Sequence, residues 1–204
     1  MKKIVIILFF IPFLSFSQYF IPFGEDSIYR TSGWYSEVYA IYPDYSNLYI
    51  GGYGCERAGN GLVINDIVYW DNNNWNTLDN GMGGVSRVYV IKKYQNQIYI
   101  GGNFNDIDNI PNTENIGRFN GTTWEALPNS YGCPNSYIND MVVWDNKLII
   151  GGWFNAIPTG SNLPYIAAYD GNDYIDINDG EVPFNVIGLA VYNMNYMLVV
   201  CGVH

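Results

Sequence analysis

Aromatic side chains are the first candidates for binding chemistry in this chain, because they make up 17% of its residues. Several fall in polar stretches rich in Asp and Asn rather than in apolar runs. Aromatic rings beside amides and carboxylates suit carbohydrate, since the rings stack on sugars and the polar groups hydrogen-bond to hydroxyls. The alternative is that the same rings pack between structural elements. The ligand-binding candidates on this basis are Tyr53, Tyr131, Tyr137, Trp153 and Tyr165.

Metal and catalytic chemistry has few residues to use. Asp106 and Asp108, in the segment NDIDN, could hold calcium, which prefers oxygen ligands; the alternative is a solvated turn. The single histidine is His204, so a zinc centre or a Ser-His-Asp triad has almost nothing to draw on. The three cysteines are odd in number and show no metal-ligand spacing. These observations predict a non-catalytic protein with no cofactor.

The first 17 residues have the features of a secretory signal peptide. Lys2 and Lys3 precede an apolar stretch from Ile4 to Leu14, which is too short for a membrane span of about 20 residues. We predict cleavage after Ser17 and export to the cell surface or medium. Loss of the two lysines changes the formal charge from −10 to −12. Nucleic acids and anionic membranes are therefore disfavoured as partners, and no other segment is apolar enough to span a bilayer.

A repeat of 50 residues positions these candidates. Four apolar runs, LYIGG, IYIGG, LIIGG and LVVCG, begin at Leu48, Ile98, Leu148 and Leu198. Strand-like runs at a fixed period of about 50 residues are typical of β-propellers. The polar loops that carry the candidate aromatics recur at fixed phases of this repeat.

Each repeat has room for four strands. An apolar segment precedes the glycine-containing run, and a later run leads into an aromatic-Asp or aromatic-Asn turn with a second aromatic beyond it. The pairs Asn120-Gly121 and Asp170-Gly171 favour hairpin turns. The continuous apolar runs indicate sheets covered on both faces. The sequence thus predicts an all-β fold of four-stranded antiparallel blades after the signal peptide, with the propeller over 18–204 and blades at about 36–84, 85–133, 134–184 and, as a partial fourth, 185–204.

The segments IYIGGNF at 98–104 and NIGRFNGTTWEAL at 115–127 resemble a known repeat. They are similar to secreted bacterial β-propeller repeats of the kelch-like and galactose-oxidase-like diglycine type, as found in Bacteroidetes type IX secretion proteins. The resemblance covers about 36–204. It implies a propeller fold, and it leaves function open because propellers include both binding modules and enzymes.

Two hypotheses account for the partial fourth blade. The chain is a fragment of a protein with further blades, which we favour, or residues 19–35 supply the outer strands of the fourth blade. For function, we expect an exported, non-catalytic binding or adhesion module for glycan or protein at the cell surface. The alternatives are a fragment of a propeller enzyme acting on polysaccharide and a purely structural repeat of a larger surface protein.

Overall fold

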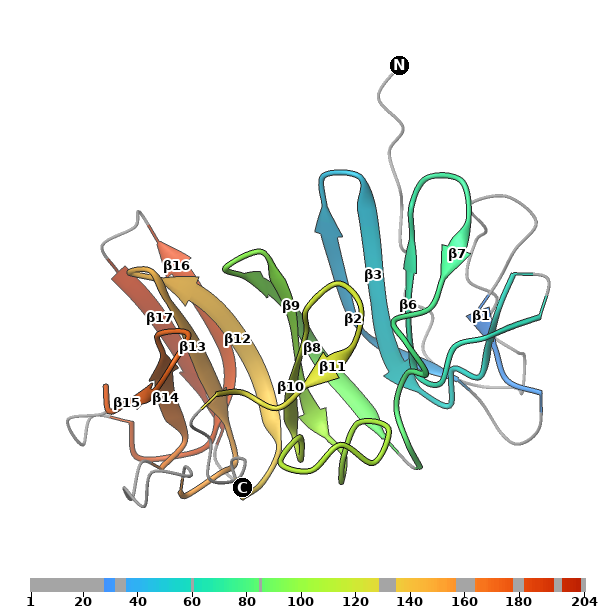
Figure 1. Cartoon of the computed structure of the whole chain (residues 1–204). Coiled ribbons are helices and arrows are strands. Elements are labelled where there is room, and N and C mark those ends of the chain that lie inside the picture. Colours follow the sequence, from blue (N-terminus) through green and yellow to red (C-terminus); the bar gives the residue numbers. More distant parts are fainter. Residues whose placement is uncertain are drawn as a thin grey trace, which may run out of the picture.

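Short antiparallel strands arranged in successive sheets form the computed structural model of this chain (Figure 1). The structure describes residues 28–31, 36–59, 61–84, 86–128, 135–156, 164–177, 182–192 and 196–202. Within these ranges the regular structure is entirely β, which confirms the predicted all-β class. No helix in the described ranges is long and apolar enough to cross a membrane. The predicted signal peptide lies outside the described residues.

Three sheets have four strands each, joined in chain order, as the repeat predicts. Neighbouring strands are antiparallel throughout. The first sheet contains β2 (Glu37–Asp44), β3 (Asn47–Tyr53), β6 (Ile67–Trp70) and β7 (Trp75–Asn76). The second contains β8 (Arg87–Tyr94), β9 (Gln97–Asn103), β10 (Ile116–Phe119) and β11 (Trp124–Glu125). The third contains β12 (Ile138–Trp144), β13 (Lys147–Gly152), β14 (Ile166–Tyr169) and β15 (Tyr174–Ile175).

Two smaller sheets flank these three. β16 (Val186–Tyr192) pairs with β17 (Tyr196–Cys201) beside the third sheet. At the other end of the row, β1 (Ile28–Tyr29), β4 (Arg57–Ala58) and β5 (Leu62–Val63) form a three-stranded sheet. Because Ile28 and Tyr29 pair with β4 of the first repeat, they do not serve as outer strands of the fourth blade. That part of the closure hypothesis is wrong.

The first strand of each sheet packs against the preceding sheet, so the sheets follow one another in an open arc (Figure 1). The side chains between the sheets are almost fully buried. Tyr49 and Ile67 of the first sheet pack with Val88 and Ile100 of the second. Tyr99 of the second packs with Tyr169 of the third, at a ring-centroid distance of 6.3 Å. The apolar runs are therefore covered on both sides, as their continuity predicts.

The recurring glycine pair has two separate steric causes. A Cβ on the first glycine, Gly51, Gly101 or Gly151, would lie 2.5–2.7 Å from a branched side chain of the next sheet. A Cβ on the second glycine would overlap a carbonyl oxygen of the first strand of its own sheet, beside a β-bulge. The pair thus lets neighbouring sheets approach closely and lets the strand pass its own bulged partner.

The fourth pair departs from the sequence alignment by one residue. The 50-residue repeat aligns Cys201 with Gly151. In the strand pairing, however, Val200 takes the place of Gly151: Val200 pairs with Gly188, and Gly151 pairs with Asp140 at the corresponding point of the third sheet. Val200 is 44% exposed and Cys201 is also exposed, so the glycine notch is missing from β17. Correspondence by sequence pattern is therefore wrong by one position in this strand.

Candidate functional site

The loops that carry the predicted site residues lie at one end of the sheets. They follow the second strand of each sheet or precede its first strand, and antiparallel pairing brings both kinds to the same end, the lower one in Figure 1. Before each third strand stands a residue with a left-handed backbone: Asp66, Asn115 or Tyr165, with φ of 66°, 63° and 72°. Its carbonyl oxygen accepts a hydrogen bond from the second glycine at 3.0–3.1 Å. The three loop ends therefore share one backbone frame.

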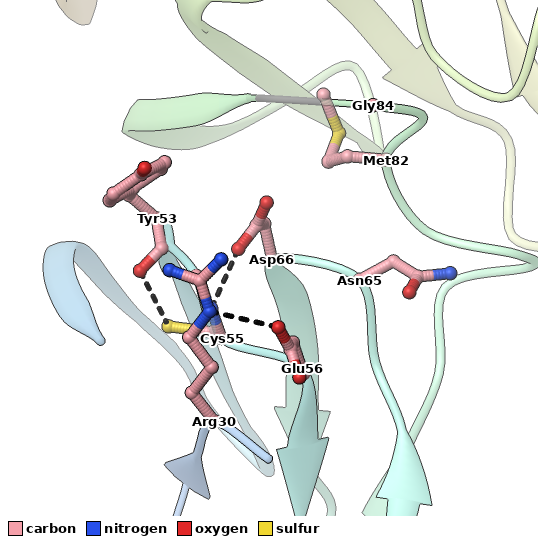
Figure 2. Close-up of a pocket in the computed structure, with 9 residues that line it drawn as sticks. Arg30, Tyr53, Cys55, Glu56, Asn65, Asp66, Met82 and Gly84 are labelled. Atoms are coloured by element: carbon pink, nitrogen blue, oxygen red, sulfur yellow. Dashed lines mark hydrogen bonds and ion pairs between the residues drawn. The ribbon is translucent and has the colours of Figure 1, made fainter. Parts of the chain in front are cut away.

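The first sheet ends in a polar pocket of about 300 Å³ (Figure 2). Asp66 lies at its base, where Oδ1 accepts from the Cys55 amide at 2.7 Å and Oδ2 accepts from the Ser86 hydroxyl at 2.9 Å. Burial raises the pKa of Asp66, although both hydrogen bonds act to lower it. The carboxylate thus ties the loop of the first sheet to the start of the second sheet.

Cys55 is a buried structural residue of this pocket. The Cys55 amide donates to the Asp66 side chain, and the Cys55 carbonyl accepts from the Asp66 amide. In the other two sheets, the carbonyls of Phe104 and Phe154 accept in the same way from the amides of Asn115 and Tyr165. Burial raises the pKa of the Cys55 thiol to about 12, so the reactive thiolate is disfavoured. Cys55 therefore takes the place that phenylalanine holds in the other two sheets, where Phe104 and Phe154 are buried core residues.

An ion pair forms the rim of the pocket. Arg30 Nε lies 2.9 Å from Glu56 Oε1, and Glu56 Oε2 accepts from the amide and hydroxyl of Thr31. The Thr31 hydroxyl bond is the main cause of the lowered pKa of Glu56. Both acidic groups of the pocket are thus engaged by neighbouring residues of the chain.

Tyr53 lines the same pocket, but cations cover its ring. The guanidinium of Arg87, from the next sheet, lies 4.5 Å from the ring centroid, and that of Arg30 lies 5.9 Å away. Such contacts are cation–π interactions. A sugar could stack on this face of Tyr53 only after Arg87 moved away.

Two of the predicted aromatics come together at the end of the third sheet. The amide of Trp153 donates to the carbonyl of Tyr137 at 2.9 Å, so the two residues are cross-strand neighbours. Trp153 is 40% exposed and Tyr137 is 38% exposed. Two partly exposed aromatic residues therefore occupy neighbouring backbone positions at the loop end of the third sheet.

Asn185 holds the indole from the adjacent β16 side. With its amide oriented to satisfy both neighbours, its oxygen accepts from Trp153 Nε1 at 2.7 Å, and its nitrogen donates to the Gly202 carbonyl at 2.5 Å. Asn185 is buried, with 6% of its surface exposed. The contact is made at the N–H edge of the indole, in contrast to the ring-face contact of Arg87 on Tyr53.

Other predicted candidates have different surroundings. Tyr165 packs against the apolar cluster between the third sheet and the β16–β17 pair, and its φ of 72° is unusual for a large side chain. Tyr131 lies outside the described residues. The structure thus brings Tyr137 and Trp153 together at the surface, while it gives Tyr165 a half-buried packing position.

Both calcium candidates accept hydrogen bonds from other residues of the chain. Asp106 Oδ1 accepts from the Asn109 amide at 2.8 Å, and Asp108 Oδ2 accepts from Asn80 Nδ2 at 2.6 Å. Within the described ranges, no cluster of three or more His, Cys, Asp or Glu residues could hold a metal ion. A calcium site at Asp106 and Asp108 stays a prediction.

Sequence reasoning missed Arg87 and Asn185, which contact the aromatic residues at the loop ends of the first and third sheets. Arg87, Tyr137 and Asn185 share one position, each directly before the branched residue that starts the inter-sheet contact. That shared position was a usable signal. The orientation of the Arg87 and Asn185 side chains toward the preceding sheet was not, because it depends on packing between sheets.

Comparison of the chain with protein-family models, curated proteins and solved structures found no match.

Proposed function

We propose that this chain is an exported binding module of β-propeller type, in which each four-stranded sheet is one blade. The 50-residue repeat and the packing of each first strand on the preceding sheet support the blade arrangement. The leader-like residues 1–17 support export. The ligand is a glycan or a protein at the cell surface.

The exposed pair of Tyr137 and Trp153 carries the proposal. Single exposed apolar residues need no explanation, but large exposed aromatics at neighbouring backbone positions are typical of recognition surfaces. The pocket carboxylates favour binding over catalysis. Asp66 and Glu56 both serve structural hydrogen bonds, and an attacking or proton-transferring group needs access to substrate.

The test uses the full chain, expressed with its leader and recovered from the medium or cell surface. N-terminal sequencing should find Gln18 as the first residue. The recovered protein is then applied to a glycan array and to intact cell-surface protein extracts. Saturable binding to either class supports the proposal, whereas no binding at micromolar concentrations contradicts it. Turnover of a polysaccharide would replace it with the enzyme alternative.

A further inference from the structure

The geometry points to a neutral saccharide as the ligand of Trp153 and Tyr137, with the Trp153 indole as the stacking surface. This inference rests on the proposed binding function and adds the chemical class of the ligand and the place where it binds. Four observations carry it: the fixed edge of the indole, the second ring, the neighbouring amides and the charge.

The indole is fixed before any ligand arrives. Its N–H bonds to Asn185, which in turn bonds to the backbone of Gly202, so the ring is tied to the neighbouring strand pair. Asn185 is buried, which makes the bond costly to break. A ring that is already oriented loses little conformational freedom when a pyranose stacks on it, and this favours affinity.

Tyr137 extends the surface from the cross-strand position. The Tyr137 carbonyl accepts from the Trp153 amide, so the two backbones are held at strand-pair distance. Tyrosine adds a second apolar ring and a hydroxyl that can bond to sugar hydroxyls. Two exposed aromatic residues at neighbouring backbone positions can contact a ligand longer than a single sugar.

Amide side chains next to this surface are also held in place. Asn135 Nδ2 donates to Asn155 Oδ1 at 2.6 Å, and Asn135 Oδ1 accepts from the Asn155 amide at 3.1 Å. Both side chains are exposed, so they can bond to hydroxyl groups as well as to each other. Neutral donors and acceptors beside an aromatic surface fit sugar hydroxyls better than they fit a charged group.

Charge selects a neutral saccharide over an acidic one. The whole chain has a formal charge of −10, so a polyanionic glycan is repelled at long range. Arg30 and Arg87, two arginines at this end of the sheets, lie over Tyr53 at the first sheet and not at Trp153. The Trp153 end offers amides instead.

The experiment measures binding of neutral hexasaccharides of glucose, mannose and galactose to the full secreted chain by calorimetry, with an oligogalacturonide as the acidic probe. At least one neutral probe should bind, and the acidic probe should bind at least tenfold more weakly. Trp153→Ala should weaken neutral binding about tenfold or more, while Trp153→Phe should recover most of it. Tyr53→Ala is the matched control, because Tyr53 holds the same position in the first sheet and should change affinity by less than about twofold.

The outcomes separate this inference from the proposed function. Neutral binding that survives Trp153→Ala, in a variant with wild-type circular dichroism, overturns the site. Binding of acidic glycans or of proteins alone overturns the ligand class but leaves the binding function standing. Absence of all binding overturns both. If Trp153→Ala does not fold, Tyr137→Ala supplies the test: it should weaken neutral binding by more than about twofold, whereas Trp153→Phe should keep most of it. Neutral binding that Tyr137→Ala leaves unchanged overturns the site.

Discussion

The first and third sheets place an aromatic residue at the same position, directly after the second glycine of the pair, yet the next sheet contacts the two rings differently. Arg87 lies over the face of Tyr53, whereas Asn185 bonds to the edge of Trp153. Before the ring the backbone is alike in both sheets, down to the hydrogen bond that the second glycine donates, although β3 includes Tyr53 and β13 ends at Gly152. The difference teaches that one residue of the following sheet decides whether the ring at this position is covered.

The sheets share a repeated backbone frame and differ in the side chains of their loops. The frame comprises the glycine pair, the bulge and the left-handed residue before the third strand, and it recurs in the three four-stranded sheets. The loop side chains differ between the sheets: they form an ionic pocket at the first sheet and an aromatic surface at the third. Substitutions can change either the frame or the loop side chains.

The largest effect is expected from the frame. Gly52→Ala and Gly152→Ala each introduce a Cβ that overlaps a carbonyl oxygen of the adjacent strand. Because backbone must move, we expect each to lower the free energy of unfolding by about 3 kcal/mol. Urea denaturation followed by circular dichroism measures it.

Similar losses at the two sites would show that the frame is equivalent in the first and third sheets. Gly121→Ala is a control with no neighbour within 4 Å of the new Cβ, although its φ of 103° adds strain of its own. If Gly152→Ala lowered the free energy of unfolding much less than Gly121→Ala does, the proposed steric cause would be contradicted.

A smaller effect is expected at the pocket of the first sheet. Asp66→Ala leaves the Cys55 amide and the Ser86 hydroxyl without their partner in a buried place. We expect a loss of about 1–3 kcal/mol in the free energy of unfolding, and a smaller loss for Ser86→Ala. The third sheet has Tyr165 at this position, and its side chain packs against an apolar cluster, so the first and third sheets should respond differently.

The pH dependence of Asp66 has a definite sign. Burial raises its pKa in the folded state above the unfolded value, so the folded chain holds the proton more tightly. Stability associated with Asp66 is therefore present below the unfolded pKa and falls as pH rises through the folded pKa. Asp66→Asn should remove this fall, which denaturation at a series of pH values would detect.

A still smaller effect is expected where the two rings differ. Arg87→Ala removes the cation over Tyr53, at a cost of about 0.5–1 kcal/mol. The same change should raise the rate of hydroxyl-radical labelling of Tyr53, measured by mass spectrometry, with Trp153 labelling unchanged as the internal control. Unchanged Tyr53 labelling would mean that Arg87 does not shield the ring in solution.

Much of the frame was predictable from sequence because it repeats. Three patterns recur at the same spacing: the glycine runs, the continuous apolar strands, and the turns at Asn120-Gly121 and Asp170-Gly171. Because they recur together, each copy supports the assignment of the others. The one-residue shift at Val200 was not predictable, since a strand slip leaves the apolar pattern almost intact in a continuous run.

The site was only partly predictable. Exposed aromatics in polar loops were found at Tyr137 and Trp153, but the same reasoning included Tyr165, which packs on the core. Composition does not distinguish a ring that faces solvent from one that faces the next sheet. The contacts of Arg87 and Asn185 join residues more than 30 positions apart, and only the packing of the sheets specifies them.

The smallest expected effect compares the outer hairpin turns of the first and third sheets with that of the second. Asp71 and Asp170 each accept hydrogen bonds from two backbone amides of their turn, whereas Asn120 makes the same two bonds without a charge. These bonds lower the pKa of both aspartates. Their contribution to stability is present above the unfolded pKa and is lost as pH falls through the folded pKa.

Replacing both aspartates by asparagine should therefore make stability less sensitive to acid and change it little at neutral pH, since the turn keeps its acceptor oxygen. The reverse change, Asn120→Asp, should add acid sensitivity to the second sheet. Thermal melts between neutral pH and about pH 3 would measure both variants. Asn120→Asp also removes the bond from Asn120 Nδ2 to Glu125, so each variant is compared with its own stability at neutral pH. An equal response of the two variants to acid would show that the turn carboxylates do not distinguish the sheets.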